Sequence, residues 1–92
     1  MAEPAWRREL NRLFASVKDD QEAEALLGEL LTPAEYAEFA RRWQIIKLLM
    51  QKKTQRVIQN ELSVSIATVT RGSRALQQGH GAFEKFYKRL YK

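Results

Sequence analysis

The chain of 92 residues contains no cysteine, one histidine, two prolines and four glycines. Without cysteine, neither a disulfide nor a thiolate metal site can stabilise the fold, and a reducing cytoplasmic location is the simplest expectation. No apolar run reaches the roughly 18 residues that a membrane span needs, and the N-terminus lacks a signal-peptide core. His80 lies in a glycine-flanked turn with no evident nucleophile or metal-ligand partner, so we expect neither an enzyme nor a metal site.

Acidic residues are scarce in one half of the chain. Residues 41–92 carry twelve Lys and Arg but only two Asp or Glu, whereas residues 1–40 carry four Lys and Arg and nine Asp or Glu. The two halves therefore have formal net charges of +10 and −5. This asymmetry favours a polyanionic partner for the basic half, although a solvated charged surface would give the same composition.

An alternating β-branched strand pattern is also absent, and the apolar residues recur at helical spacing. The sequence predicts an all-α single domain of about six helices over residues 1–92. Thr32-Pro33-Ala34-Glu35 forms a capping box, which predicts a long helix from there to about Gln51. The apolar arc of that helix is too wide for packing on one side, and a chain this short buries little surface alone. We therefore expect a homodimer.

Two short helices follow, capped by Thr54 and Ser65 and joined by about three residues. This pattern is typical of a helix-turn-helix, here over about 54–77. Its expected core is Val57, Ile58, Leu62, Val64, Val69 and Leu76, and the opposite face of its second helix is expected to present Ala67, Thr70, Arg71 and Arg74. A small residue, a hydroxyl and two guanidinium groups suit a DNA major groove, whereas an ordinary helical hairpin with a basic rim would show the same pattern.

The second of these helices contains Gly72 in its interior. Glycine costs roughly 1 kcal/mol relative to alanine at such a position. Something close to the backbone is therefore expected to need the room.

The string TQRVIQNELSVSIATVTRGSRAL, preceded by LLTPAE and RWQII, resembles the DNA-binding segment of the bacterial tryptophan repressor family. The resemblance covers about Leu30 to Leu76. It implies an intertwined all-helical homodimer that binds a double-stranded DNA operator and represses transcription. It also implies free L-tryptophan as corepressor, with no other cofactor.

The resemblance also implies site residues. The ligand pocket would use Leu31, Thr32, Arg42, Arg71 and Gly72, with the two arginines sandwiching the indole and Gly72 leaving room for it. Operator contacts would come from Gln55, Arg56, Gln59, Ile66, Ala67, Thr68, Thr70, Arg71 and Arg74. Four of the five pocket residues have another explanation as well: Thr32 caps a helix, Arg42 is solvated, Arg71 binds phosphate, and Gly72 permits close helix packing.

Several positions depart from the family pattern. Ala75 replaces a serine that helps to place the ligand's amino group, and Glu29 stands where a leucine carbonyl is used. Gln59 replaces a lysine, and Ser63 replaces a turn glycine, which strains the turn by up to about 1–2 kcal/mol if the left-handed conformation is kept. The segment before the helix-turn-helix is one residue shorter. The alternatives are a ligand-independent helix-turn-helix regulator on the same scaffold and a basic interaction module for RNA or protein. A transposase-type DNA-recognition fragment is a third, but it needs a catalytic region, which this sequence does not show.

Overall fold

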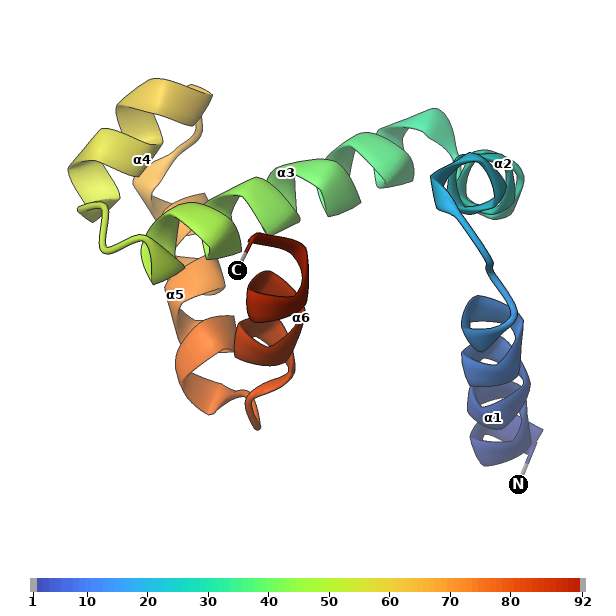
Figure 1. The fold of residues 1–92 in the computed structure, drawn as a ribbon. Helices are drawn as coiled ribbons and strands as arrows, with labels where there is room; N and C mark the ends of the chain where they lie inside the picture. The colour runs from blue at the N-terminus through green and yellow to red at the C-terminus, as the bar shows by residue number, and fades with distance from the viewer. Residues whose placement is uncertain (1, 92) are drawn as a thin grey trace. The chain divides into compact units, whose positions relative to one another are not determined.

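The computed structural model describes residues 2–91, and over that range it contains helices and no strand. Figure 1 shows α1 (Ala2–Ala15), α2 (Asp20–Leu30), α3 (Pro33–Met50), α4 (Gln55–Leu62), α5 (Ile66–Gln78) and α6 (Ala82–Tyr91). The all-α prediction is confirmed. The contacts divide the chain into two compact units, Met1–Tyr36 and Ala37–Lys92, and the expectation of a single domain stays a prediction.

Side-chain caps fix the starts of α3, α4 and α5. The Thr32 N–H donates to Glu35 Oε1 at 2.8 Å, and the Glu35 N–H donates to Thr32 Oγ1 at 3.2 Å. Thr54 and Ser65 each accept a backbone N–H bond of 3.2 Å from the third residue of the helix that follows. A cap of this kind contributes about 1 kcal/mol, and all three predicted starts are confirmed.

The first unit leaves its apolar side chains uncovered. None of residues 2–36 is buried, and the large apolar side chains of α1 recur at helical spacing. They are Trp6, Leu10, Leu13 and Phe14, and each is more than two-fifths exposed. An apolar face of this size marks an interaction surface.

The core of the second unit joins α3, α4 and α5. Its buried residues are Ile45, Ile46, Leu48, Ile58 and Val69, and Leu49, Leu62 and Val64 pack against them partly buried. All the buried residues of α3 fall in its C-terminal half. In contrast, Phe39 in the N-terminal half is 49% exposed, so the second unit does not cover the whole apolar arc of this helix by itself.

The prediction that Val57 belongs to the core of the α4–α5 pair is wrong. Val57 is 37% exposed, whereas its neighbour Ile58 is fully buried. Successive residues of a helix point about 100° apart, and in a helix as short as α4 only one narrow stripe reaches the core. Of the other predicted core residues, Val69 is buried and Leu76 is half-buried.

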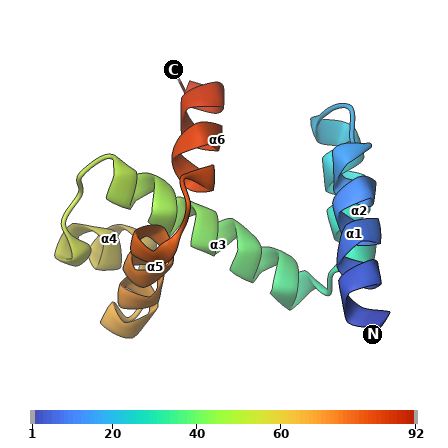
Figure 2. The same cartoon turned by 90° about the horizontal axis from the view of Figure 1, so that it is seen from below.

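The last helix packs on α3 through aromatic side chains. The rings of Trp43 and Phe83 lie 6.4 Å apart between centroids, and Gln51 Nε2 donates to the Tyr87 hydroxyl at 3.3 Å. Trp43 Nε1 donates a hydrogen bond to the Tyr91 hydroxyl at 3.4 Å. Because Phe83, Tyr87 and Tyr91 recur every four residues, they form one face of α6. Figure 2 shows α6 rising from this part of α3. Within residues 2–91, no helix combines the length and apolarity needed to cross a bilayer.

Ser63 ends α4 in the left-handed conformation, with φ 54° and ψ 46°. This conformation costs a residue with a Cβ about 1–2 kcal/mol. Glycine avoids that cost, but it also gives the unfolded chain more entropy, which offsets part of the gain. Ser63→Gly should therefore raise the free energy of unfolding by about 1 kcal/mol. Urea denaturation measures the change. Ser73→Gly, inside α5, is the matched control and should lower stability. A loss of stability in both variants would show that Ser63 is not strained.

Candidate nucleic-acid interface and ligand cavity

The helices α4 and α5 form one packed pair. Residues 63–65 connect the two helices, which pack directly against each other. Ile58 of α4 and Val69 of α5 are both fully buried in the shared core. The Val64 N–H in the turn donates to the Gln59 carbonyl at 3.3 Å, and Ser65 caps α5. The turn and the core therefore fix the angle at which α5 is presented.

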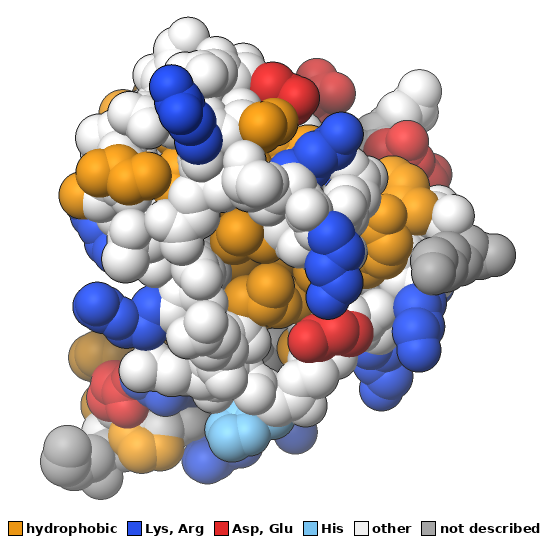
Figure 3. All heavy atoms as spheres, turned by 90° about the vertical axis from the view of Figure 1, so that its left-hand side faces the viewer, with side chains coloured by type: hydrophobic (Ala, Val, Ile, Leu, Met, Phe, Trp, Pro, Cys, Tyr) orange, Lys and Arg blue, Asp and Glu red, His pale blue; other side chains and the backbone are white. Residues whose placement is uncertain are grey.

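The outer face of α5 carries the residues predicted to enter a groove. Ala67, Thr70, Arg71 and Arg74 are all exposed, at positions i, i+3, i+4 and i+7. We call these four residues the α5 outer face. Figure 3 views the molecule from the α4 side, where Lys and Arg side chains project at several places.

The other predicted operator contacts differ in exposure. Gln55 and Arg56 at the start of α4 and Ile66 at the start of α5 are exposed. Gln59 and Thr68 are half-buried. The Thr68 hydroxyl lies 2.9 Å from Ser65 Oγ, so it is already hydrogen-bonded within the cap of α5.

The cations near the α4–α5 pair take no part in the ion pairs of residues 2–91. Over residues 2–91 the ion pairs are Arg7 with Glu3 and Arg41 with Glu38. The cations without an ion-pair partner in that range include five in or just before the α4–α5 pair: Lys52, Lys53, Arg56, Arg71 and Arg74. All five are exposed. Their charge remains available to a polyanion.

A cavity of about 260 Å³ lies between α3 and α5. It is lined by Glu38, Arg41, Arg42 and Ile45 of α3 and by Thr68, Arg71, Gly72 and Ala75 of α5. Each set follows the spacing i, i+3, i+4, i+7, so one stripe of each helix faces the cavity. The volume is just below the roughly 300–1,000 Å³ of typical ligand sites, which suits a small ligand.

The structure brings together three of the five predicted ligand residues. Arg42, Arg71 and Gly72 line the cavity. Leu31 and Thr32 are not among its lining residues. Leu31 ends α2, where its N–H bonds back into the helix, and Thr32 is engaged in the capping box of α3.

Gly72 has the structural explanation of close helix packing. A Cβ added there would lie 2.5 Å from Ile45 Cγ2 and 3.8 Å from Leu49 Cδ1. Real Cβ atoms essentially never come as close as the first of these distances. Close packing of α5 on α3 therefore accounts for this glycine, and its role in making room for a ligand stays a prediction. Gly72 nevertheless lines the cavity.

Sequence reasoning missed the acidic and basic residues on the α3 side of the cavity. Glu38 and Arg41 were assigned no role, yet both line it. Their spacing from Arg42 could have indicated this position, because residues three and four apart lie on one stripe of a helix.

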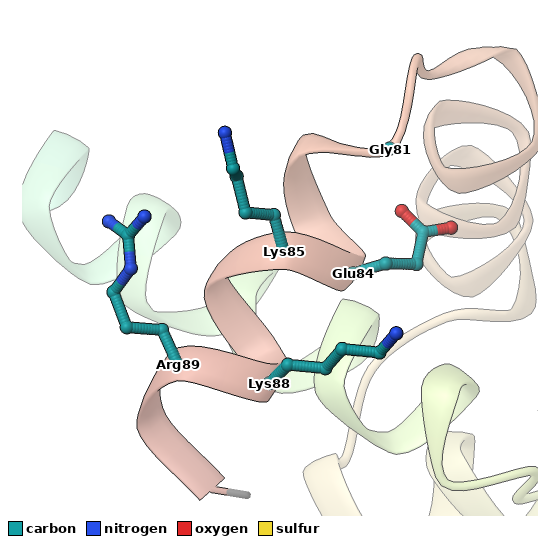
Figure 4. A pocket seen from close by; sticks show the side chains of 5 residues that line it. All are labelled: Gly81, Glu84, Lys85, Lys88 and Arg89. Atoms are coloured by element: carbon teal, nitrogen blue, oxygen red, sulfur yellow. The ribbon is translucent and has the colours of Figure 1, made fainter.

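A second hollow lies along α6. Its lining comes from that helix and the residue before it: Gly81, Glu84, Lys85, Lys88 and Arg89. In Figure 4, Lys85 and Arg89 project to one side of α6, and Glu84 and Lys88 to the other. The charged groups do not converge on one point, so this hollow is no site. The residues described by the structure hold no cluster of three or more metal-binding side chains.

These features define a class, the small all-α proteins in which two short helices, α4 and α5, pack against each other. The chain belongs to the Trp repressor protein family, whose family model matches residues 6–91. That family is one of transcriptional regulators.

Similar proteins include a Trp operon repressor homolog from Mannheimia succiniciproducens, 38% identical over 85 residues, with 91% of this chain and 83% of that protein covered. An uncharacterized protein, YerC, from Bacillus subtilis is 31% identical over 86 residues, with 90% and 83% covered. A TrpR-like protein from Eubacterium eligens, known from its crystal structure, has a TM-score of 0.84 and 26% identity, with 90% of this chain and 86% of that chain covered.

Proposed function

We propose that this protein is a sequence-specific DNA-binding transcriptional repressor that acts in the cytoplasm as a homodimer. The observation that carries the proposal is the α5 outer face, which is exposed and basic on a helix pair held by the core that α3, α4 and α5 share. Family membership supports the same function.

The α5 outer face supplies the chemistry of major-groove recognition. Ala67 permits close approach to the bases, and the Thr70 hydroxyl can donate or accept a hydrogen bond. Arg71 and Arg74 provide guanidinium groups, which pair with guanine O6 and N7 or with phosphate. Lys52, Lys53 and Arg56, which have no ion pairs among residues 2–91, contact phosphates.

The dimer covers the apolar surface that one chain leaves exposed. Trp6 is 65% exposed on α1, and Phe39 is 49% exposed on α3. We expect light scattering to give the mass of a dimer at micromolar concentration, because these surfaces are too apolar to remain in water. A well-folded monomer at that concentration would contradict the proposal. Trp6→Lys should shift the mass towards the monomer, whereas Arg8→Lys, which keeps the charge, should leave the dimer intact.

The α3–α5 cavity makes the repressor responsive to a small ligand, and L-tryptophan is the corepressor we propose. Arg42 and Arg71 both line the cavity, and guanidinium groups stack on aromatic rings. Thr68 and Arg71 are also predicted operator contacts. A ligand in the cavity therefore touches side chains that meet DNA, and it can change the DNA affinity through them.

A second candidate is a ligand-independent regulator on the same scaffold. The observation that favours it is Ala75, which lines the cavity with a methyl group where a hydroxyl would help to hold an amino acid. Operator binding that is equal with and without L-tryptophan would select this candidate.

Selection of duplexes from a randomised pool tests the proposed function. The dimer should enrich a near-palindrome with half-site centres about 34 Å apart, one helical turn of DNA. Selection with and without L-tryptophan separates the two candidates. A pool that shows no enriched sequence under either condition would refute sequence-specific binding.

A further inference from the structure

The side chains that line the α3–α5 cavity differ in charge and in whether they can accept a hydrogen bond. Arg41, Arg42 and Arg71 are donors only, because a guanidinium group has no acceptor. The Thr68 hydroxyl is hydrogen-bonded to Ser65. The remaining lining residues apart from Glu38 have apolar side chains or none. Glu38 is therefore the one anionic acceptor among the residues that line the cavity.

Glu38 stands at one end of the α3 stripe. It precedes Ile45 by seven residues, which is roughly 10 Å along a helix axis. Ile45 marks the other end of the stripe, where Gly72 allows α5 to approach α3. The side chain of Glu38 is 55% exposed and that of Arg41 is 43% exposed, so a ligand can reach both.

The ion pair with Arg41 leaves acceptor capacity on Glu38. Only the Oε1 atom of Glu38 is paired with Arg41 Nη1. A carboxylate has two oxygens with about four lone-pair sites, so it can accept a further N–H bond. An ammonium group from a ligand can therefore share Glu38 with Arg41.

We propose that Glu38 is a specificity-determining residue that accepts the α-ammonium group of an amino-acid ligand. This inference rests on the proposed function, in which an aromatic amino acid binds in the cavity. The three guanidinium groups complement the ligand's carboxylate, and Glu38 complements its ammonium group. Glu38 thereby supplies the polar contact that the methyl group of Ala75 does not.

Calorimetric titration with two probes tests this assignment. L-tryptophan and indole-3-propionate share the ring and the carboxylate, but only the first carries an ammonium group. Glu38→Gln should weaken L-tryptophan binding about two- to five-fold, as expected for a partly exposed charge pair, and should leave indole-3-propionate binding unchanged or stronger. Glu84→Gln on α6 is the matched control and should change neither affinity.

A second variant should act in the opposite direction. Arg41→Gln frees Glu38 from its ion pair and removes one cation that serves both ligands. The ratio of L-tryptophan affinity to indole-3-propionate affinity should therefore rise, whatever happens to each affinity alone. Thermal melting of the variants confirms that they are folded.

The outcomes separate failure of this inference from failure of the proposed function. Equal changes for both probes in Glu38→Gln, or no change for either, would overturn the role of Glu38 while leaving L-tryptophan as the ligand. Binding of neither probe to the wild-type protein would overturn this role together with the proposed corepressor. Duplex binding by that same protein would then identify the ligand-independent regulator.

Discussion

Gly72→Ala should lower the free energy of unfolding by about 1–2 kcal/mol, although alanine is the better helix former by about 1 kcal/mol. The added Cβ would lie 2.5 Å from Ile45 Cγ2, and Ile45 is only 2% exposed, so its side chain has little space to move. Overpacking therefore outweighs the gain in helix propensity. For a domain of this size the loss corresponds to a fall in melting temperature of roughly 4–16 °C.

Two further variants test the cause of that loss. Ile45→Leu removes the Cγ2 atom at nearly constant volume, so combining it with Gly72→Ala should recover part of the lost stability. Gly28→Ala in α2 is the control, because nothing lies within 4 Å of the added Cβ, and it should leave stability unchanged or raised. If Gly72→Ala instead raised the melting temperature, the close contact between α5 and Ile45 would be refuted.

The features that the sequence predicted well are local. The caps at Thr32, Thr54 and Ser65 depend on residues three positions apart, and each is present in the structure. The sequence also identified Ser63 as the residue that would be strained if the turn kept a left-handed conformation, and Ser63 has that conformation. The partners in these interactions lie within about one helical turn of each other in the sequence, so the sequence pattern alone predicts them.

The features that the sequence did not predict depend on packing between helices. The exposure of Val57 depends on which stripe of α4 meets α3 and α5. The need for Gly72 depends on Ile45, 27 positions earlier in the chain. The cavity role of Glu38 depends on the same crossing of α3 and α5. Helical spacing defines the stripes on each helix, but it does not say which stripes face each other.

A strong salt dependence of DNA affinity is the second large effect that we expect. Each chain presents five cations without ion pairs around the α4–α5 pair, among residues 2–91, and a dimer doubles that number. Binding of these cations to phosphates releases counterions, so log affinity falls linearly with log salt, by about 0.9 per phosphate neutralised. With six to ten phosphate contacts, affinity should fall about 10³- to 10⁵-fold between 50 and 200 mM salt.

Arg74→Gln separates this effect from general surface charge. Arg74 belongs to the α5 outer face and does not line the ligand cavity, so the substitution leaves the cavity lining intact. Two copies per dimer should reduce the salt slope by about 2 if Arg74 contacts phosphate. Lys88→Gln on α6 removes the same charge away from the α4–α5 pair and should leave the slope unchanged.

The most direct test of DNA binding through the α4–α5 pair is a fluorescence anisotropy titration of a labelled duplex at several salt concentrations. The wild-type protein and Lys88→Gln should give the same steep linear slope, and Arg74→Gln should bind more weakly, with a shallower slope if Arg74 contacts phosphate. A flat salt dependence, an absence of duplex binding at low salt, or equal losses in the two variants would contradict DNA binding through this pair of helices.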